Sequence, residues 1–215
     1  REIKQGAVDL EKLRGLLAMV PDVRDAPNAV RLLEPKGEVL FDSVALSHEG
    51  RAVGVKDVIF TLPAGKKLAL VGTSGAGKST IFNVLTRLTD PQNGTAMVGD
   101  VAVTDIALTD LRDLFSVVSQ DALLFDETLR ENILLGREDV SATDVRDALA
   151  DVGLWDEVMS LVDGLETELT TGGGPLTASQ ATRLMLARAI LAEPRLLLLD
   201  GPLDALSPSN REIVL

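Results

Sequence analysis

The chain has 215 residues, 46% hydrophobic and 25% charged, so it is long enough to bury the core of one large domain or two small ones. Its 33 acidic residues outnumber 21 basic ones, and the formal net charge of -12 argues against a nucleic-acid-binding protein. The lack of cysteine excludes disulfides and thiolate metal sites, and the single histidine excludes any site that needs two imidazoles.

The first twenty residues carry apolar side chains at a helical spacing, with charged residues between them. Pro21 and the polar stretch through Pro35 predict a linker after this helix, which would therefore act as a tether or, alternatively, present a dimerisation stripe. No run of eighteen apolar residues occurs, so we expect a soluble chain without a membrane span or signal peptide. The charged start without methionine suggests a piece of a longer protein. The apolar positions are Val8, Leu10, Leu13, Leu16, Leu17 and Val20.

From Glu38 onward, short β-branched and apolar runs alternate with helical patterns. We expect strands in "EVLFDSVAL", "VKDVIFTL" and "KLALVG", with "LPAGK" forming the turn between the last two. Helices are expected over residues 78–88, 108–114, 141–152 and 177–192. This alternation predicts an α/β fold with a largely parallel sheet, and the region 106–169 is expected to form a mostly helical subdomain.

A glycine-rich segment, "GTSGAGKST", matches the pattern G-x-x-x-x-G-K-[ST] between an expected strand and an expected helix. Its glycines allow backbone N–H groups to turn inward around an anion, and the helix N-terminus adds partial positive charge. Lys78 is expected to reach the β- and γ-phosphates, and the Ser79 hydroxyl to ligate magnesium. The segment therefore predicts ATP or GTP binding. Its residues are Gly72, Thr73, Ser74, Gly75, Ala76, Gly77, Lys78, Ser79 and Thr80.

Three further motifs follow this loop in a fixed order: "VSQDALLFDETLRENI", "ATRLMLARAIL" and "LLLLD". Together with the loop they resemble the nucleotide-binding domain of exporter-type ABC transporters over nearly the whole chain. The opening "REIKQGAVDLEKLRGLLAMVPDVRDAP" looks like the cytoplasmic end of an exporter's last transmembrane helix and its linker. It is most similar to the heavy-metal-tolerance and mitochondrial iron–sulfur-related exporters.

The resemblance implies a P-loop NTPase of ABC type, with a RecA-like parallel-sheet core, an antiparallel β-subdomain and an inserted α-helical subdomain. Residues 1–36 would be the tether and linker, 37–105 and 170–215 the nucleotide-binding core, and 106–169 the helical subdomain with the Q-loop. The implied cofactors are ATP and Mg2+. The implied partners are the transmembrane domain of the same transporter and a second ABC nucleotide-binding domain, at the cytoplasmic face of a membrane.

The resemblance also implies roles for single residues. Gln120 would contact magnesium and the attacking water, and Asp200 would bind magnesium at the end of its strand. His48 lies where exporters place a tyrosine that stacks on adenine, although a solvated loop histidine is an equal alternative.

Two departures from the family pattern concern the chain's own site. Gly201 stands where the glutamate that polarises the attacking water is expected. Because general-base assistance is worth about 10²- to 10⁴-fold in rate, we expect ATP binding with very slow hydrolysis. The following D-loop includes Asp204 but has Ser207 in place of its aspartate.

Two other departures concern the site of a partner domain. The signature motif, usually L-S-G-G-Q, reads Leu176, Thr177, Ala178, Ser179, Gln180. Thr177 keeps a hydroxyl for the partner's γ-phosphate, whereas Ala178 and Ser179 place Cβ atoms where bare backbone normally approaches it. Thr171 replaces a glutamate that contacts the membrane domain.

Four altered motifs favour a naturally degenerate domain over one engineered change. The sequence therefore predicts the ATP-binding domain of an exporter-type ABC transporter with impaired or partner-dependent hydrolysis. A non-hydrolysing, ATP-gated regulatory module is the alternative. A free-standing P-loop kinase is disfavoured, because nothing resembles a pocket for an acceptor substrate.

Overall fold

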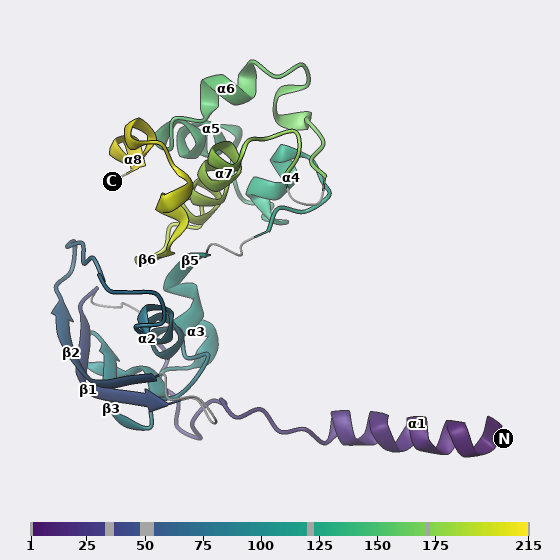
Figure 1. The fold of residues 1–215 in the computed structure, drawn as a ribbon, viewed down its shortest axis with the longest axis vertical. Coiled ribbons are helices and arrows are strands. Elements are labelled where there is room, and N and C mark those ends of the chain that lie inside the picture. Colours follow the sequence, from purple (N-terminus) through teal and green to yellow (C-terminus); the bar gives the residue numbers. More distant parts are fainter. Residues whose placement is uncertain (1, 33–36, 48–53, 120–122, 171–172, 215) are drawn as a thin grey trace.

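The computed structural model describes residues 2–32, 37–47, 54–119, 123–170 and 173–214. Two hydrophobic cores lie in two lobes, from one of which an N-terminal helix projects (Figure 1). The boundaries of the three expected domains remain a prediction.

The first lobe is built on a four-stranded antiparallel sheet in the order β2-β1-β3-β4. Phe41 is fully buried in this lobe, and its ring stacks on that of Phe60 with the centroids 4.6 Å apart. Two helices, α2 and α3, lie beside the sheet (Figure 1). The elements are β1 Val39–Ser47, β2 Gly54–Leu62, α2 Lys78–Leu85, β3 Asn93–Val98, β4 Val101–Ala102, η1 Val103–Asp105 and α3 Leu108–Asp113.

The second lobe is mostly helical and is joined to the first by a two-stranded parallel sheet, β5-β6. Helix α7 packs on β5, and α4 and α5 pack on α7 around fully buried Leu149 and Leu186. Capping boxes at Thr128, Ser141 and Thr177 explain why α4, α5 and α7 begin where they do. The elements are β5 Phe115–Ser119, α4 Leu129–Leu134, α5 Ala142–Asp151, α6 Trp155–Met159, η2 Gly164–Glu166, α7 Ala178–Ile190, β6 Leu196–Asp200, η3 Pro202–Ala205 and α8 Pro208–Val214.

One expected strand is wrong: residues 67–71, in "KLALVG", form no strand. A strand requires a hydrogen-bonded neighbour, and no strand of the described chain pairs with this segment. Leu68 is accordingly 45% exposed and Val71 94% exposed. The expected predominance of parallel pairing is also not found in the described residues, where the larger sheet is antiparallel. The four helices expected between residues 78 and 192 are all present, each slightly shorter than expected.

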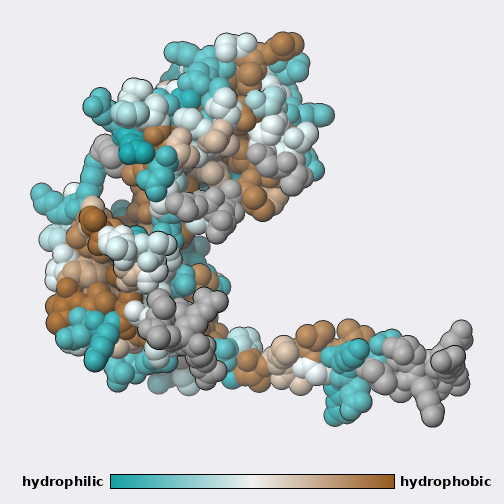
Figure 2. Space-filling model, in the orientation of Figure 1, coloured by the Kyte–Doolittle hydropathy of each residue, from teal (hydrophilic) through white to brown (hydrophobic). Residues whose placement is uncertain are grey.

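The predicted N-terminal helix is present as α1 (Glu2–Leu17), which extends away from both lobes (Figure 1). Leu10, Leu13 and Leu17 are all more than half exposed, and hydrophobic residues are visible along this projection in Figure 2. Among the helices that the structure describes, α1 included, none combines the length and the apolar character needed to cross a membrane.

Candidate nucleotide-binding site

The glycine-rich loop of residues 72–77 leads directly into α2, as the sequence predicts. Gly77, the residue before the helix, has φ 88°, a left-handed conformation that side chains disfavour. A Cβ atom on Gly77 would lie 2.5 Å from Cγ1 of Val55 on β2. A residue larger than glycine would therefore push the loop away from the sheet.

The polar groups of this loop suit an anion. The amide N–H groups of Gly77, Lys78 and Ser79 have no hydrogen-bond partner among the described residues, and no side chain caps α2. The Lys78 ammonium instead donates to the carbonyl oxygens of Gly72 and Thr73, both at 2.9 Å. Free amides at a helix N-terminus, next to a lysine held by loop carbonyls, fit a phosphate group. Two of the three N–H donors of the Lys78 ammonium are used by these carbonyls, which leaves the third for a phosphate oxygen.

Asp200 is the last residue of β6, and the parallel register places it opposite Ser119, the last residue of β5. Ligands of α/β proteins bind where the carboxyl ends of such strands meet. Asp200 and Ser119 line an open pocket of about 390 Å3 together with Phe82 and Asn83 of α2. The structure thus brings the predicted magnesium carboxylate beside the helix that carries Ser79. A hydroxyl and a carboxylate are the oxygen donors that suit Mg2+.

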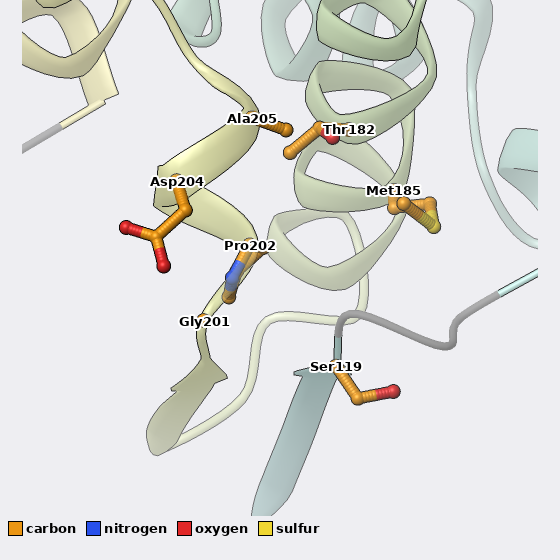
Figure 3. Close-up of a pocket in the computed structure, with 7 residues that line it drawn as sticks. All are labelled: Ser119, Thr182, Met185, Gly201, Pro202, Asp204 and Ala205. Carbon is orange, nitrogen blue, oxygen red and sulfur yellow. The ribbon is translucent and has the colours of Figure 1, made fainter. Parts of the chain in front are cut away.

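A second open pocket, of about 230 Å3, is lined in part by Gly201, the residue that follows Asp200 in the sequence (Figure 3). Gly201 contributes no side chain to it and has φ 77° and ψ 4°, in the left-handed region. Glycine thus fits this backbone without strain, which is a local reason for its presence that the sequence did not show. Its lining comes from β5, α7 and the segment after β6, namely Ser119, Thr182, Met185, Gly201, Pro202, Asp204 and Ala205.

The predicted signature residues form the start of α7, and their polar groups are already engaged. Thr177 Oγ1 accepts a hydrogen bond from the Gln180 amide at 3.2 Å and donates to Gln180 Oε1 at 3.0 Å. Gln180 Nε2 donates to Glu157 of α6 at 2.8 Å, and Arg183 forms an ion pair with the same carboxylate at 2.8 Å. The hydroxyl expected to face a partner's phosphate caps a helix in this structure. Leu176 is half-buried beside this cap.

The remaining departures from the family pattern also have local contacts. Asn210 of α8 donates to Ser179 Oγ at 3.2 Å, so the Ser179 side chain is turned toward α8, whereas Ala178 is exposed. Ser207 precedes Pro208, the first residue of α8, and its Oγ accepts a hydrogen bond from the Asn210 amide at 3.3 Å. Serine followed by proline is a favourable start for a helix.

Three predicted residues, His48, Gln120 and Thr171, lie outside the described part of the chain. The strand β5 ends at Ser119, directly before Gln120 in the sequence. Their predicted roles remain predictions.

The sequence alone does not reveal Glu157, Arg183 and Asn210, since their contacts cross between elements distant in the chain. Arg183 is only 3% exposed and also donates to the Gly153 carbonyl at 2.6 Å. A charged residue inside an otherwise apolar helical stripe is the signal that points to such a buried pair. The capping box at Thr177 was visible in the sequence as threonine followed three residues later by glutamine.

A glycine-rich loop of this pattern at a helix N-terminus, with an aspartate ending a nearby parallel strand, defines a P-loop nucleotide-binding domain. The family model described as "ABC transporter" matches residues 55–204. The chain therefore belongs to the ABC transporter family, which confirms the predicted fold class and the resemblance to this family.

Individual relatives agree with this assignment. The chain is 35% identical over 199 residues to "Uncharacterized ABC transporter ATP-binding protein YknV" of Bacillus subtilis, covering 93% of this chain and 33% of that protein. It is 34% identical over 216 residues to "Iron-sulfur clusters transporter ATM1, mitochondrial" of Chaetomium globosum, covering 100% of this chain and 36% of that protein. The chain thus spans about a third of the length of these relatives.

A solved structure described as a bacterial Atm1-family ABC exporter with ATP bound has a TM-score of 0.91 and 31% sequence identity. The alignment covers 99% of this chain and 37% of the exporter chain. The predicted similarity to mitochondrial iron–sulfur-related exporters is confirmed by these matches. The chain is a nucleotide-binding domain of the type found in such exporters.

Proposed function

We propose that the chain binds Mg-ATP through residues 72–80 and Asp200 and couples nucleotide-driven dimerisation to transport by an exporter. The observation that carries ATP binding is the phosphate loop, whose amides at the start of α2 lack partners in the described chain. In this proposal Lys78 contacts the β- and γ-phosphates, and Ser79, Asp200 and Gln120 hold magnesium. The partners are a membrane domain of the same protein and a second nucleotide-binding domain, at the cytoplasmic face of a membrane.

Gly201 supports a further part of the proposal, namely slow or partner-dependent hydrolysis. Magnesium supplies charge neutralisation to the phosphates when it is bound, but Gly201 offers no carboxylate to take a proton from water. The changes at Ala178 and Ser179 support weak assistance to a partner's site. If hydrolysis is absent altogether, the chain acts as an ATP-gated module that dimerises and controls its membrane partner.

ATP binding is tested with a fluorescent ATP analogue and the variant Lys78→Ala. Loss of charge-assisted hydrogen bonds worth about 1.5–3 kcal/mol weakens binding by roughly 10- to 150-fold. Lys66→Ala is the matched control, because Lys66 is an exposed lysine that precedes the loop. Equal affinity in the two variants would contradict the assignment of the loop. Light scattering with and without Mg-ATP then tests dimerisation, and a chain that remains monomeric at saturating nucleotide contradicts that part of the proposal.

A further inference from the structure

Arg87 is a buried charge at the far end of the phosphate-loop helix. Arg87 lies two residues beyond Leu85, the last residue of α2. Its backbone amide donates a hydrogen bond to the Val84 carbonyl, in the last turn of that helix, at 3.1 Å. The residue is only 3% exposed. Its backbone has φ 53°, a left-handed conformation that costs free energy for a residue other than glycine. Such strain persists where surrounding contacts over-determine it.

Those contacts join three separate segments. Arg87 Nε donates to Asp90 Oδ1 at 2.9 Å, in the loop after α2. Nη1 donates to the Ile106 carbonyl at 3.3 Å, just before α3, and Nη2 donates to the Arg24 carbonyl at 2.8 Å. Arg24 belongs to the linker that follows α1. A single guanidinium therefore connects the phosphate-loop helix to the linker.

The same linker is attached independently to the start of α3. The Leu108 amide donates to Asp25 Oδ1 at 2.7 Å, and Val30 forms a parallel bridge with Ile106. Farther along, the Leu32 amide donates to Asp110 Oδ2 at 3.1 Å, and exposed Arg31 pairs with the same carboxylate at 3.4 Å. These contacts hold the linker on the first lobe but do not reach α2. Among the hydrogen bonds of the described side chains, the one from Arg87 to the Arg24 carbonyl joins the linker to the segment that ends α2.

This arrangement matters because Lys78 is the first residue of α2. A phosphate in the loop accepts hydrogen bonds from the Lys78 ammonium and from the free amides at the start of α2, which changes the forces on this end of the helix. An eight-residue helix moves as one piece, so a shift at Lys78 reaches Val84 and Arg87. The guanidinium then carries that shift to the Arg24 carbonyl.

We propose that Arg87 is a positioning residue that transmits nucleotide binding at the phosphate loop to the linker and α1. This inference rests on the proposed function, because it requires ATP at residues 72–80. It adds a direct connection between the nucleotide site and the tether, through the far end of α2. The connection depends on the donors of Arg87 and not on its bulk.

The test measures the position of the linker with spin labels. The chain lacks cysteine, so Asp22→Cys in the linker and Lys56→Cys on β2, both exposed positions, can be labelled selectively. The distance between the two spin labels is measured by double electron–electron resonance with and without Mg-ATP. The affinity for a fluorescent ATP analogue is measured on the same samples. Arg87→Met keeps the aliphatic bulk and removes the donors. Arg31→Ala is the control, since it removes a linker contact to α3 and none to α2.

We expect Mg-ATP to shift the label distance in the parent chain and in Arg31→Ala, and the shift to be lost in Arg87→Met at unchanged ATP affinity. Arg87→Lys keeps the charge, but its donors all lie on one nitrogen and cannot span the three acceptors, so it should retain only part of the shift. If Arg87→Met does not fold, a full-sized shift in Arg87→Lys overturns the proposal. A parent chain that binds ATP without any shift, or an Arg87→Met chain that shifts fully, also overturns it. A parent chain that fails to bind ATP overturns the proposed function, and the inference with it.

Discussion

Replacing Gly201 with glutamate tests the proposal that hydrolysis is slow because a general base is missing. If this position is that of the general base, the new carboxylate should raise the rate of ATP hydrolysis by about 100-fold or more, since such assistance is worth about 10²- to 10⁴-fold. The side chain would enter the pocket of about 230 Å3 that Gly201 shares with Asp204 and Ser119.

The structure also predicts a cost for this substitution. At φ 77° a side chain is strained by about 1–2 kcal/mol, which for a chain of this size lowers the unfolding temperature by about 2–8 °C. Gly201→Gln carries the same strain and nearly the same volume without a base. Phosphate release is therefore compared between the glutamate and glutamine variants, at equal occupancy by Mg-ATP and at a protein concentration that permits dimers.

Equal phosphate release by the two variants would refute the reasoning about the missing base. In that outcome the altered signature and D-loop limit the reaction, or the chain is an ATP-gated module that does not hydrolyse. An unchanged unfolding temperature in both variants would separately refute the conformational argument for glycine.

The remaining predictions concern stability. Nη1 of Arg188 is buried without a hydrogen-bond partner in the described structure, and burial together with nearby Arg137 lowers the pKa of Arg188. Arg188→Met should therefore raise the free energy of unfolding by about 1 kcal/mol in urea titrations, whereas Arg183→Met, which breaks bonds to Glu157, should lower it by about 3 kcal/mol. Hydrogen bonds from the Ser141 cap hold the pKa of Asp144 below its ordinary value, so this carboxyl stabilises the fold above about pH 4 and loses that effect as pH falls further. Asp144→Asn should weaken the dependence of the urea midpoint on pH below 4; an acid limb identical to that of the parent chain would contradict this.

Local patterns predicted most of the fold. The spacing of apolar residues identified α2, α3, α5 and α7, and the glycine-rich loop was placed correctly before α2. The strand expected over residues 67–71 failed because strand formation depends on a neighbour, which a local hydrophobic run does not reveal. Long-range hydrogen bonds of side chains were not predicted for the same reason. No local pattern in the sequence links Arg87 to the Arg24 carbonyl or Asn210 to Ser179.

Three of the residues that depart from the predicted family pattern have a structural role in their present form, whereas Ala178 is exposed. Gly201 occupies a left-handed turn, Ser207 caps α8, and Ser179 accepts a hydrogen bond from Asn210 of that helix. Ser207 Oγ accepts from the backbone amide of Asn210, and Ser179 Oγ accepts from the side-chain amide of the same residue. One residue of α8 therefore contacts both the predicted D-loop and the predicted signature. Because the two serines share this neighbour, the effects of Ser179→Gly and Ser207→Asp on stability should not be additive.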